Sequence, residues 1–439
     1  MTIYHWSWNR TPRIEMDLDN ILEQIGEFGK FQIQNYLLIC LPVIFSAANS
    51  LTYVFTAAIP KYRCFVPSCD DPMNATYDSD WVPYAVPPNK ISRSSKVFEP
   101  DQCFYYKQKE FNGSEFCEPD DFTNETLKCN EWVFDPHERS IVNDWLITCP
   151  ENEPKLALVG TMHFAGIAFG TVVSGFLADR FGRKNIFILS ILLMAITGVL
   201  QVISGGLFWF YIFMFLNAVG TAGVYPLAFI LGVEMVGKSK REIASMALNY
   251  FYAVGEAMVG ILAWLSRDWI ILQIAASAPP VLFILIIPDS TRWLIAKGRL
   301  FEAKAIIDKA AHVNGKEFTS IVPVQLTSNQ KDKLTAANKR EIWTTFKAII
   351  RSGGCGALST SARFAALLAP FVPLLEHIDR SFPLTLFGII AFIGGFLTLI
   401  LPETLNTKLP ETVQDAENLG RKILETDQNN SKEIEITRL

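Results

Sequence analysis

Long apolar runs alternate along this chain with polar segments rich in charge, Pro and Gly. Eight runs are long enough to cross a bilayer as a helix, which takes about 20 residues. Charges, Pro or Gly mark their ends. The expected spans are 36–59, 156–178, 185–204, 208–233, 243–265, 269–288, 353–375 and 383–401. The pattern predicts an all-α multi-pass membrane protein, with a kink in the sixth span at Pro279 and Pro280.

The first 35 residues are polar, contain acids and lack an apolar core with a cleavage site, so the first span is expected to act as an uncleaved insertion signal. Within them, apolar residues recur at helical spacing from Asp17 to Gln32. Such spacing is typical of an amphipathic helix on a membrane surface. We therefore expect residues 1–35 to form a cytoplasmic segment that leads into the first span.

Residues 60–155 form a polar segment between the first two spans, rich in cysteines and glycosylation sequons. Six cysteines in one short segment imply three disulfides in an oxidising compartment, with fifteen connectivities possible. The cysteines are Cys64, Cys69, Cys103, Cys117, Cys129 and Cys149, and the sequons begin at Asn74, Asn112 and Asn124. The segment is therefore predicted to be an extracellular, glycosylated loop.

Short basic loops give a second argument for the orientation. Arg180, Arg183 and Lys184 follow the second span, and Lys238, Lys240 and Arg241 follow the fourth, on the same side. Because cytoplasmic loops carry an excess of Lys and Arg, both termini are expected in the cytoplasm. Residues 289–352 then form a cytoplasmic loop and residues 402–439 a cytoplasmic tail.

Composition agrees with membrane insertion. Apolar residues make up 50% of the 439 residues, aromatic residues 12% and charged residues 19%. The net charge of −5 is segregated into loops, so nucleic acid is not expected as a partner. With five His, no metal-ligand cluster and no phosphate-binding G-x-x-x-x-G-K-[ST] motif, neither an enzyme nor a cofactor is predicted.

The segment from Gly175 to Lys184 reads G-F-L-A-D-R-F-G-R-K and lies between the second and third spans. It resembles the cytoplasmic loop between helices two and three of the major facilitator superfamily, whose members move small solutes by alternating access. The resemblance implies that Asp179, Arg180 and Arg183 stabilise one conformational state, with Gly175 and Gly182 supplying the turn. Glu234 and Arg241, which flank the loop after the fourth span, are candidate partner charges, and solvated loop ends are the alternative.

Three further segments resemble the organic cation and organic anion transporters, the solute carrier 22 family. They are the D-L-D…G-x-F-G-x-F-Q stretch at 17–32, P-D-S-T-R-W-L at 288–294 and P-E-T…L-P-E-T at 402–412. That family has twelve membrane helices in two halves. The resemblance implies that residues 156–288 complete the amino-terminal six-helix half, whereas residues 353–401 supply two helices similar to helices eleven and twelve. Helices seven to ten are expected to be missing.

Few ionisable residues lie well inside the spans: His163, Glu256 and Arg363. A charge at the bilayer centre costs at least about 2.5 to 3.5 kcal/mol, so each must face protein, water or a partner. Arg363 lies where the related anion and zwitterion carriers tend to have an arginine, which would bind a carboxylate. Glu256 is a second candidate for substrate contact, with a structural hydrogen bond as the alternative.

Aromatic side chains provide the remaining candidates for the substrate site. Tyr225 and Tyr252 are expected to line a cavity, unless they serve in packing.

Transport of small organic ions at the plasma membrane, with anions or zwitterions slightly favoured, is the predicted function. One alternative is a truncated, non-transporting isoform that regulates or competes with a full-length transporter, with retention in the endoplasmic reticulum. A sugar carrier is a weaker alternative, because it would share the loop motif at 175–184 but not the cysteine-rich loop.

Overall fold

The computed structural model describes residues 18–67, 69–89, 98–109, 117–287, 290–296, 298–316, 362, 365–372 and 381–398. The chain divides into two units, Met1–Val322 and Pro323–Leu439. In the second unit, helix α15 (Phe382–Thr398) covers most of the predicted span 383–401. The predicted span 353–375 lies largely outside the described residues, as do Arg363, Asn112 and the whole of residues 402–439.

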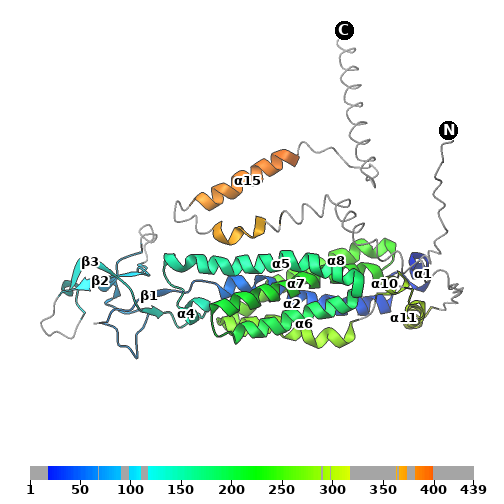
Figure 1. Ribbon diagram of the computed structural model, residues 1–439, viewed down its shortest axis with the longest axis horizontal. Helices are drawn as coiled ribbons and strands as arrows, with labels where there is room; N and C mark the ends of the chain where they lie inside the picture. The colour runs from blue at the N-terminus through cyan, green and yellow to red at the C-terminus, as the bar shows by residue number, and fades with distance from the viewer. Residues whose placement is uncertain are drawn as a thin grey trace, which may run out of the picture. The chain divides into compact units, whose positions relative to one another are not determined.

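Five helices of the first unit are long and apolar enough to cross a membrane. They lie side by side as a bundle (Figure 1). They are α2 (Lys30–Thr56), α5 (Glu153–Phe181), α6 (Arg183–Val202), α7 (Leu207–Met235) and α8 (Arg241–Ser266). Each predicted span from the first to the fifth thus coincides with one helix.

The sixth predicted span, 269–288, is not one continuous α-helix. Helix α9 (Trp269–Ser277) is followed by a 3₁₀ helix, η5 (Pro279–Ile286). Pro279 and Pro280 lack the N–H groups that an α-helix needs at these positions, which accounts for the change. The sixth segment is therefore shorter as an α-helix than the sequence predicts, with a change of helix type at the predicted kink.

The amino-terminal segment also differs from the prediction of one amphipathic helix over 17–32. Helix α1 (Leu18–Ile25) ends at Gly26, whose φ of +99° is a conformation that favours glycine. Helix α2 then begins at Lys30, six residues before the predicted start of the first span. A short turn thus separates a surface helix from the first membrane helix.

The bundle is closely packed where α6 and α7 meet. A Cβ atom added to Gly220 of α7 would lie 2.6 Å from the backbone nitrogen of Met194 of α6. Small residues allow such close approach of membrane helices. The buried side chains of α2, α6, α7 and α8, among them Ile39, Phe187 and Leu231, form the largest apolar cluster of the described residues.

A buried polar network joins four of the helices. Asn49 of α2 donates to Asn217 Oδ1 (2.8 Å) and Thr221 Oγ1 (2.9 Å) of α7. Its Oδ1 accepts from Ser277 Oγ (3.0 Å) and Gln273 Nε2 (3.3 Å) of α9. Asn217 in turn donates to the carbonyl oxygen of Met194 of α6 (2.8 Å). Since these side chains are buried, the amide of Asn49 obtains its partners within the protein.

The cysteine-rich segment folds as a small region with two antiparallel two-stranded sheets. One pairs β1 (Tyr62–Cys64) with β4 (Trp132–Phe134), and the other pairs β2 (Phe104–Gln108) with β3 (Phe122–Lys128). Short helices α3 (Val82–Ala85) and α4 (Ile141–Trp145) complete it. In the structure Cys64 is joined to Cys129, Cys69 to Cys117 and Cys103 to Cys149.

A buried ion pair organises the interior of this region. The Arg63 guanidinium donates two 2.7 Å hydrogen bonds to Asp70, and both side chains are nearly inaccessible. Arg63 also donates to three backbone carbonyl oxygens and lies 4.8 Å from the ring centre of Trp81. These bonds satisfy a charge that would be costly to bury alone.

Residues 289–352, predicted as a loop, contain two helices in their described part. These are α10 (Thr291–Ala296) and α11 (Leu300–Val313). Ile307 of α11 packs with Leu22 and Ile25 of α1. Asn314 then accepts from the backbone N–H of Phe31 (3.0 Å) and donates to Ile25 O (2.9 Å). The helices α1, α10 and α11 lie together at one end of the bundle, opposite the cysteine-rich region (Figure 1).

Candidate functional site

A group of aromatic and polar side chains lies on one face of the bundle, between α2, α7 and α8. The rings of Tyr225 and Tyr252 meet edge to face, with centres 5.1 Å apart. The Tyr225 hydroxyl donates to Asn249 Oδ1 (2.9 Å), and the Tyr252 hydroxyl is 3.3 Å from Ser50 Oγ. The structure thus brings together two of the residues predicted from the sequence, with both hydroxyl groups fixed by neighbours.

Glu256 extends this face along α8. Asn249, Tyr252 and Glu256 are separated by three and four residues, which puts them on the same side of a helix. The side chain of Glu256 is exposed, and it makes no ion pair with another described residue. An exposed carboxylate within a membrane helix needs water or a partner. We call Tyr225, Asn249, Tyr252 and Glu256 the tyrosine face.

His163, the other ionisable residue of the first six spans, lies elsewhere. Its ring is buried and stacks on Tyr53 at 4.9 Å between centres. The stacked rings of His163 and Tyr53 thus pack α5 against α2. This packing does not bring His163 to the tyrosine face.

The basic loop motif forms a second cluster, at the opposite end of the bundle from the cysteine-rich region. Arg183, the first residue of α6, makes an ion pair with Glu234 of α7. Asp179 Oδ1 lies 4.0 Å from Arg183 Nη2. Glu234 also accepts a 2.6 Å hydrogen bond from Ser290 Oγ, and both residues are buried. The cluster therefore links α5, α6 and α7 to the segment that begins α10.

The glycines and remaining charges of the motif have separate places. Gly182 has a φ of +102°, and a Cβ atom there would lie 3.1 Å from the Trp293 ring, so both conformation and space favour glycine. Gly175 lies inside α5, six residues before its end, so the prediction that it supplies the turn is wrong. A Cβ atom added there would meet open space, whereas Gly182 is the glycine at the turn. Arg180 is exposed, with its guanidinium carbon 5.5 Å from the ring centre of Phe181. Arg241 begins α8 and is half-buried.

Sequence reasoning misses several members of both clusters. Ser50 and Asn249 belong to no motif, although Asn249 lies one helical turn before Tyr252. Ser290 and Trp293 belong to the P-D-S-T-R-W-L segment, so a signal for them is present. From the sequence that segment is only a family motif, whereas the structure shows Ser290 bonded to Glu234 and Trp293 against Gly182.

The cysteine-rich region is attached to the bundle through α4. Asp144 accepts hydrogen bonds from Trp269 Nε1 (2.9 Å) and Arg139 Nε (2.9 Å). Arg139 also pairs by its backbone with the turn between α8 and α9, through a 2.9 Å bond to Arg267 O. The hydrogen bond to Asp144 raises the pKa of Arg139 above its ordinary value. The ring of Trp145 packs against Trp269, 6.0 Å between centres.

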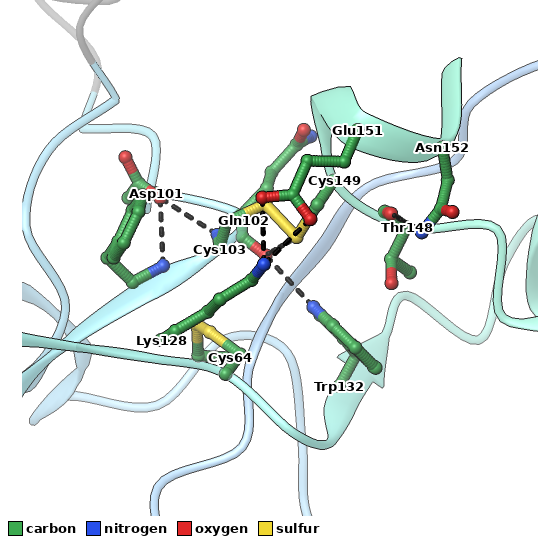
Figure 2. The surroundings of a disulfide bond; sticks show 12 residues. Cys64, Asp101, Gln102, Cys103, Lys128, Trp132, Thr148, Cys149, Glu151 and Asn152 are labelled. Atoms are coloured by element: carbon green, nitrogen blue, oxygen red, sulfur yellow. Dashed lines mark hydrogen bonds and ion pairs between the residues drawn. A yellow bond between two sulfur atoms is a disulfide. The ribbon is translucent and has the colours of Figure 1, made fainter. Parts of the chain in front are cut away.

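The last disulfide lies close to the entry of α5. Figure 2 shows Lys128 reaching Glu151 (2.7 Å) beside the bond between Cys103 and Cys149. In the same surroundings, Trp132 donates to Gln102 O (3.1 Å). The sequon residues Asn74 and Asn124 are exposed, as glycan attachment requires.

Within the described ranges, no three His, Cys, Asp or Glu side chains gather as metal ligands. The described part of the chain combines a bundle of membrane helices, a partly exposed polar and aromatic face on it, and a charged cluster at one end. These are the features of a multi-pass membrane carrier for small solutes.

The family match identifies the carrier class more narrowly. A family model described as sugar (and other) transporter matches residues 110–353, more than half of the chain. The chain therefore belongs to the sugar (and other) transporter family of the major facilitator superfamily, and it is a carrier rather than an enzyme.

Curated relatives agree with that assignment. The chain is 27% identical over 541 residues to the organic cation transporter protein of Drosophila melanogaster, with 93% of this chain and 96% of the relative covered. It is 34% identical over 312 residues to the organic cation/carnitine transporter 2 of Mus musculus, covering 68% of this chain and 54% of that relative. The first alignment is longer than the 439-residue chain, so the relative has residues without a counterpart in this chain.

One similar solved structure is the xylose transporter XylE from E. coli in a partially occluded inward-open conformation. The TM-score is 0.40 and the sequence identity is 12%, and the match covers 78% of this chain and 69% of that chain. The fold assignment rests on the family match.

Proposed function

We propose that this chain carries small organic ions across the plasma membrane and that the tyrosine face receives the cationic group of the substrate. The single observation that supports this most directly is the exposed carboxylate of Glu256, one turn along α8 from Tyr252, whose ring is paired with that of Tyr225. Aromatic faces and a carboxylate together attract an ammonium group. Relatives named as organic cation transporters are consistent with such a substrate.

A zwitterion fits the candidate residues better than a simple cation. Arg363 is a cation within the predicted seventh span, in the Ser-Ala-Arg context similar to that of anion and zwitterion carriers. Its position lies outside the described residues. A guanidinium binds a carboxylate by two parallel hydrogen bonds, while Glu256 would attract an ammonium group. We therefore rank a zwitterion first, and then a simple organic cation or anion.

The charged cluster at the other end of the bundle is proposed as the gate. In this superfamily two halves rock against each other around a midplane site. The ion pair between Arg183 and Glu234, with Asp179 and Ser290 beside it, would stabilise one of the two conformations. Because Ser290 connects the pair to α10, movement of the cytoplasmic helices would be coupled to the gate.

The principal alternative is a chain that does not transport and instead regulates or competes with a longer transporter. The observation that favours it is the 541-residue alignment, in which the Drosophila relative has residues with no counterpart in this chain. Loss of helices seven to ten would produce such a gap and leave two helices of the second half. A chain of this kind would be retained in the endoplasmic reticulum.

Uptake by the purified full chain in liposomes tests the proposal. Four labelled probes of similar size differ in charge: glycine betaine, tetramethylammonium, benzoate and glucose. Saturable uptake of glycine betaine above that of empty liposomes is expected, and Glu256→Gln should reduce it at least about tenfold, since one lost charge-assisted contact is worth about 1.5 to 3 kcal/mol. Glu242→Gln, on the first turn of the same helix, is the matched control and should transport normally.

Each other outcome has a definite meaning. Saturable uptake of glucose alone would support the sugar carrier. Uptake of none of the probes by correctly folded protein would overturn transport and support the regulatory isoform. If Glu256→Gln and Glu242→Gln reduced uptake equally, the tyrosine face would not be part of the substrate site.

Topology and location can be tested in cells. We propose glycans at Asn74, Asn112 and Asn124 and the three disulfides in an extracellular loop. Surface labelling, together with glycans that resist an enzyme specific for immature forms, would support the plasma membrane. Glycans that remain sensitive to that enzyme would support retention in the endoplasmic reticulum.

A further inference from the structure

Two turns meet at the end of the bundle that is predicted to be cytoplasmic. One connects α1 to α2 and contains Glu27. The other connects α7 to α8 and contains Gly237 and Ser239, with the short 3₁₀ helix η4 (Lys238–Lys240). The backbone N–H of Gly237 donates to Glu27 O (3.1 Å), and the Ser239 hydroxyl donates to the Glu27 carboxylate.

The contact between these turns is close. A Cβ atom added to Gly237 would lie 2.6 Å from Glu27 Cγ, so the backbone of one turn lies directly against the side chain of the other. Ser239 itself is exposed. The Ser239 hydroxyl is therefore accessible from solvent and also donates the hydrogen bond that joins the two turns at Glu27.

The sequence around Ser239 is strongly basic. Lys238 and Lys240 flank it, and Arg241 follows, giving K-S-K-R. Protein kinases select substrates in part by charge pattern. Besides its two bonds to Glu27, the short turn is closed by a backbone bond from Lys240 N–H to Gly237 O (3.1 Å), and these three bonds would have to break for it to open.

Neighbouring serines differ from Ser239 in their surroundings. Ser290 is buried and bonded to Glu234. Ser245, six residues further along, is half-buried within α8, where its hydroxyl donates to Arg241 O (2.8 Å). Ser239 thus differs from both in being exposed and in lying within a basic turn.

We propose that Ser239 is a phosphorylation site for a serine kinase that recognises basic sequences, and that its phosphorylation separates the two turns. The γ-phosphoryl group of ATP is transferred to Ser239 Oγ. An O–P bond forms, the bond to the β-phosphate oxygen breaks to release ADP, and the hydroxyl proton goes to the base of the kinase.

The consequence follows from charge. The serine hydroxyl donates a hydrogen bond to Glu27, whereas a phosphate at pH 7 carries a charge of about −1.5 to −2 and offers mainly acceptor oxygens. Phosphate and carboxylate therefore repel each other where the two turns meet. Helix α1 remains held by α11 through Leu22, Ile25 and Ile307, so the effect is confined to the turns.

Phosphorylation can be tested on the purified full chain in lipid nanodiscs with ATP and one of two kinases. An arginine- and lysine-directed serine kinase should label the peptide that contains Ser239, and an acid-directed serine kinase should not. Ser239→Ala should abolish this label, and Ser245→Ala should leave it unchanged. Labelling of a free synthetic 234–244 peptide without labelling of the intact chain would overturn the proposal, because the turn would then be inaccessible.

The repulsion can be tested without a kinase. Hydrogen exchange at the Gly237 amide reports directly on its bond to Glu27. Ser239→Asp should accelerate that exchange about tenfold relative to Ser239→Ala, which removes only the hydroxyl. Adding Glu27→Gln should return the rate to within about twofold of Ser239→Ala, and an equal rate in Ser239→Asp and Ser239→Ala would refute the repulsion.

Discussion

Replacing Asn49 by Ala should markedly destabilise the bundle of membrane helices. The side chain makes four hydrogen bonds, two to α7 and two to α9. Hydrogen bonds between membrane helices average about 0.6 kcal/mol, so the four together contribute about 2.4 kcal/mol. For a domain of 150 to 250 residues, this corresponds to a fall in Tm of roughly 5 to 10 °C.

Thermal unfolding in detergent, followed by loss of the monodisperse peak in size-exclusion chromatography, measures the change. Asn185→Ala is the matched control, because Asn185 lies near the surface and its side chain donates to Phe181 O, one turn earlier. Combining Asn49→Ala with Gln273→Ala should lower the Tm by less than the sum of the single effects, since the two residues share a bond. A Tm for Asn49→Ala within about 1 °C of the unmodified chain would refute the network's role.

Three other substitutions test charged contacts. Glu234→Gln removes the charge that pairs with Arg183, and should cost about 2 to 4 kcal/mol of stability, measured as a lower Tm. Asp70→Asn leaves the guanidinium of Arg63 buried without a counter-charge, and should cost about 3 to 5 kcal/mol, measured as faster proteolysis of the cysteine-rich region. Asp144→Ala should cost about 1 to 2 kcal/mol, measured as faster hydrogen exchange where α4 meets α9.

Exposed acids in the same regions serve as controls. Glu242→Gln, Asp78→Asn and Glu138→Ala should each change stability by less than about 0.5 kcal/mol. If Glu234→Gln had the same Tm as Glu242→Gln, the ion pair between Glu234 and Arg183 would contribute nothing to stability. Unchanged proteolysis of Asp70→Asn would show that Arg63 finds other partners, and unchanged exchange in Asp144→Ala would show that α4 is held by its apolar side chains alone.

The membrane helices are predictable because their length and apolar content follow from the thickness of the bilayer. The loop motif is predictable for a similar reason, since charges concentrate where spans end. The features that the sequence does not predict are those that depend on contacts between residues far apart in the chain. Asn314 bonds to Phe31 across 283 positions, and neither residue carries a local signal for that bond. Helix α11, which is short and amphipathic, likewise falls within a segment predicted as a loop.

The candidate site is predictable in part. Tyr225, Tyr252 and Glu256 stand out as aromatic or charged residues within spans, but the edge-to-face contact of the two rings arises only when α7 and α8 pack together. Ser50 and Asn249 escape prediction because single polar residues in membrane helices are common and have no motif. His163 satisfies the same criterion as Glu256 and yet packs against Tyr53, so ionisable character alone does not identify a site.

The hydrogen bonds of Asn49 also constrain the order in which the chain is synthesised. Its partners on α9 lie 224 and 228 residues further along, so they leave the ribosome long after α2 has entered the membrane. Until then the carbonyl of this amide lacks its final donors in an apolar environment. The first helix therefore cannot reach its final state until translation has delivered the sixth segment, so the Asn49 network is completed late in the synthesis of the bundle.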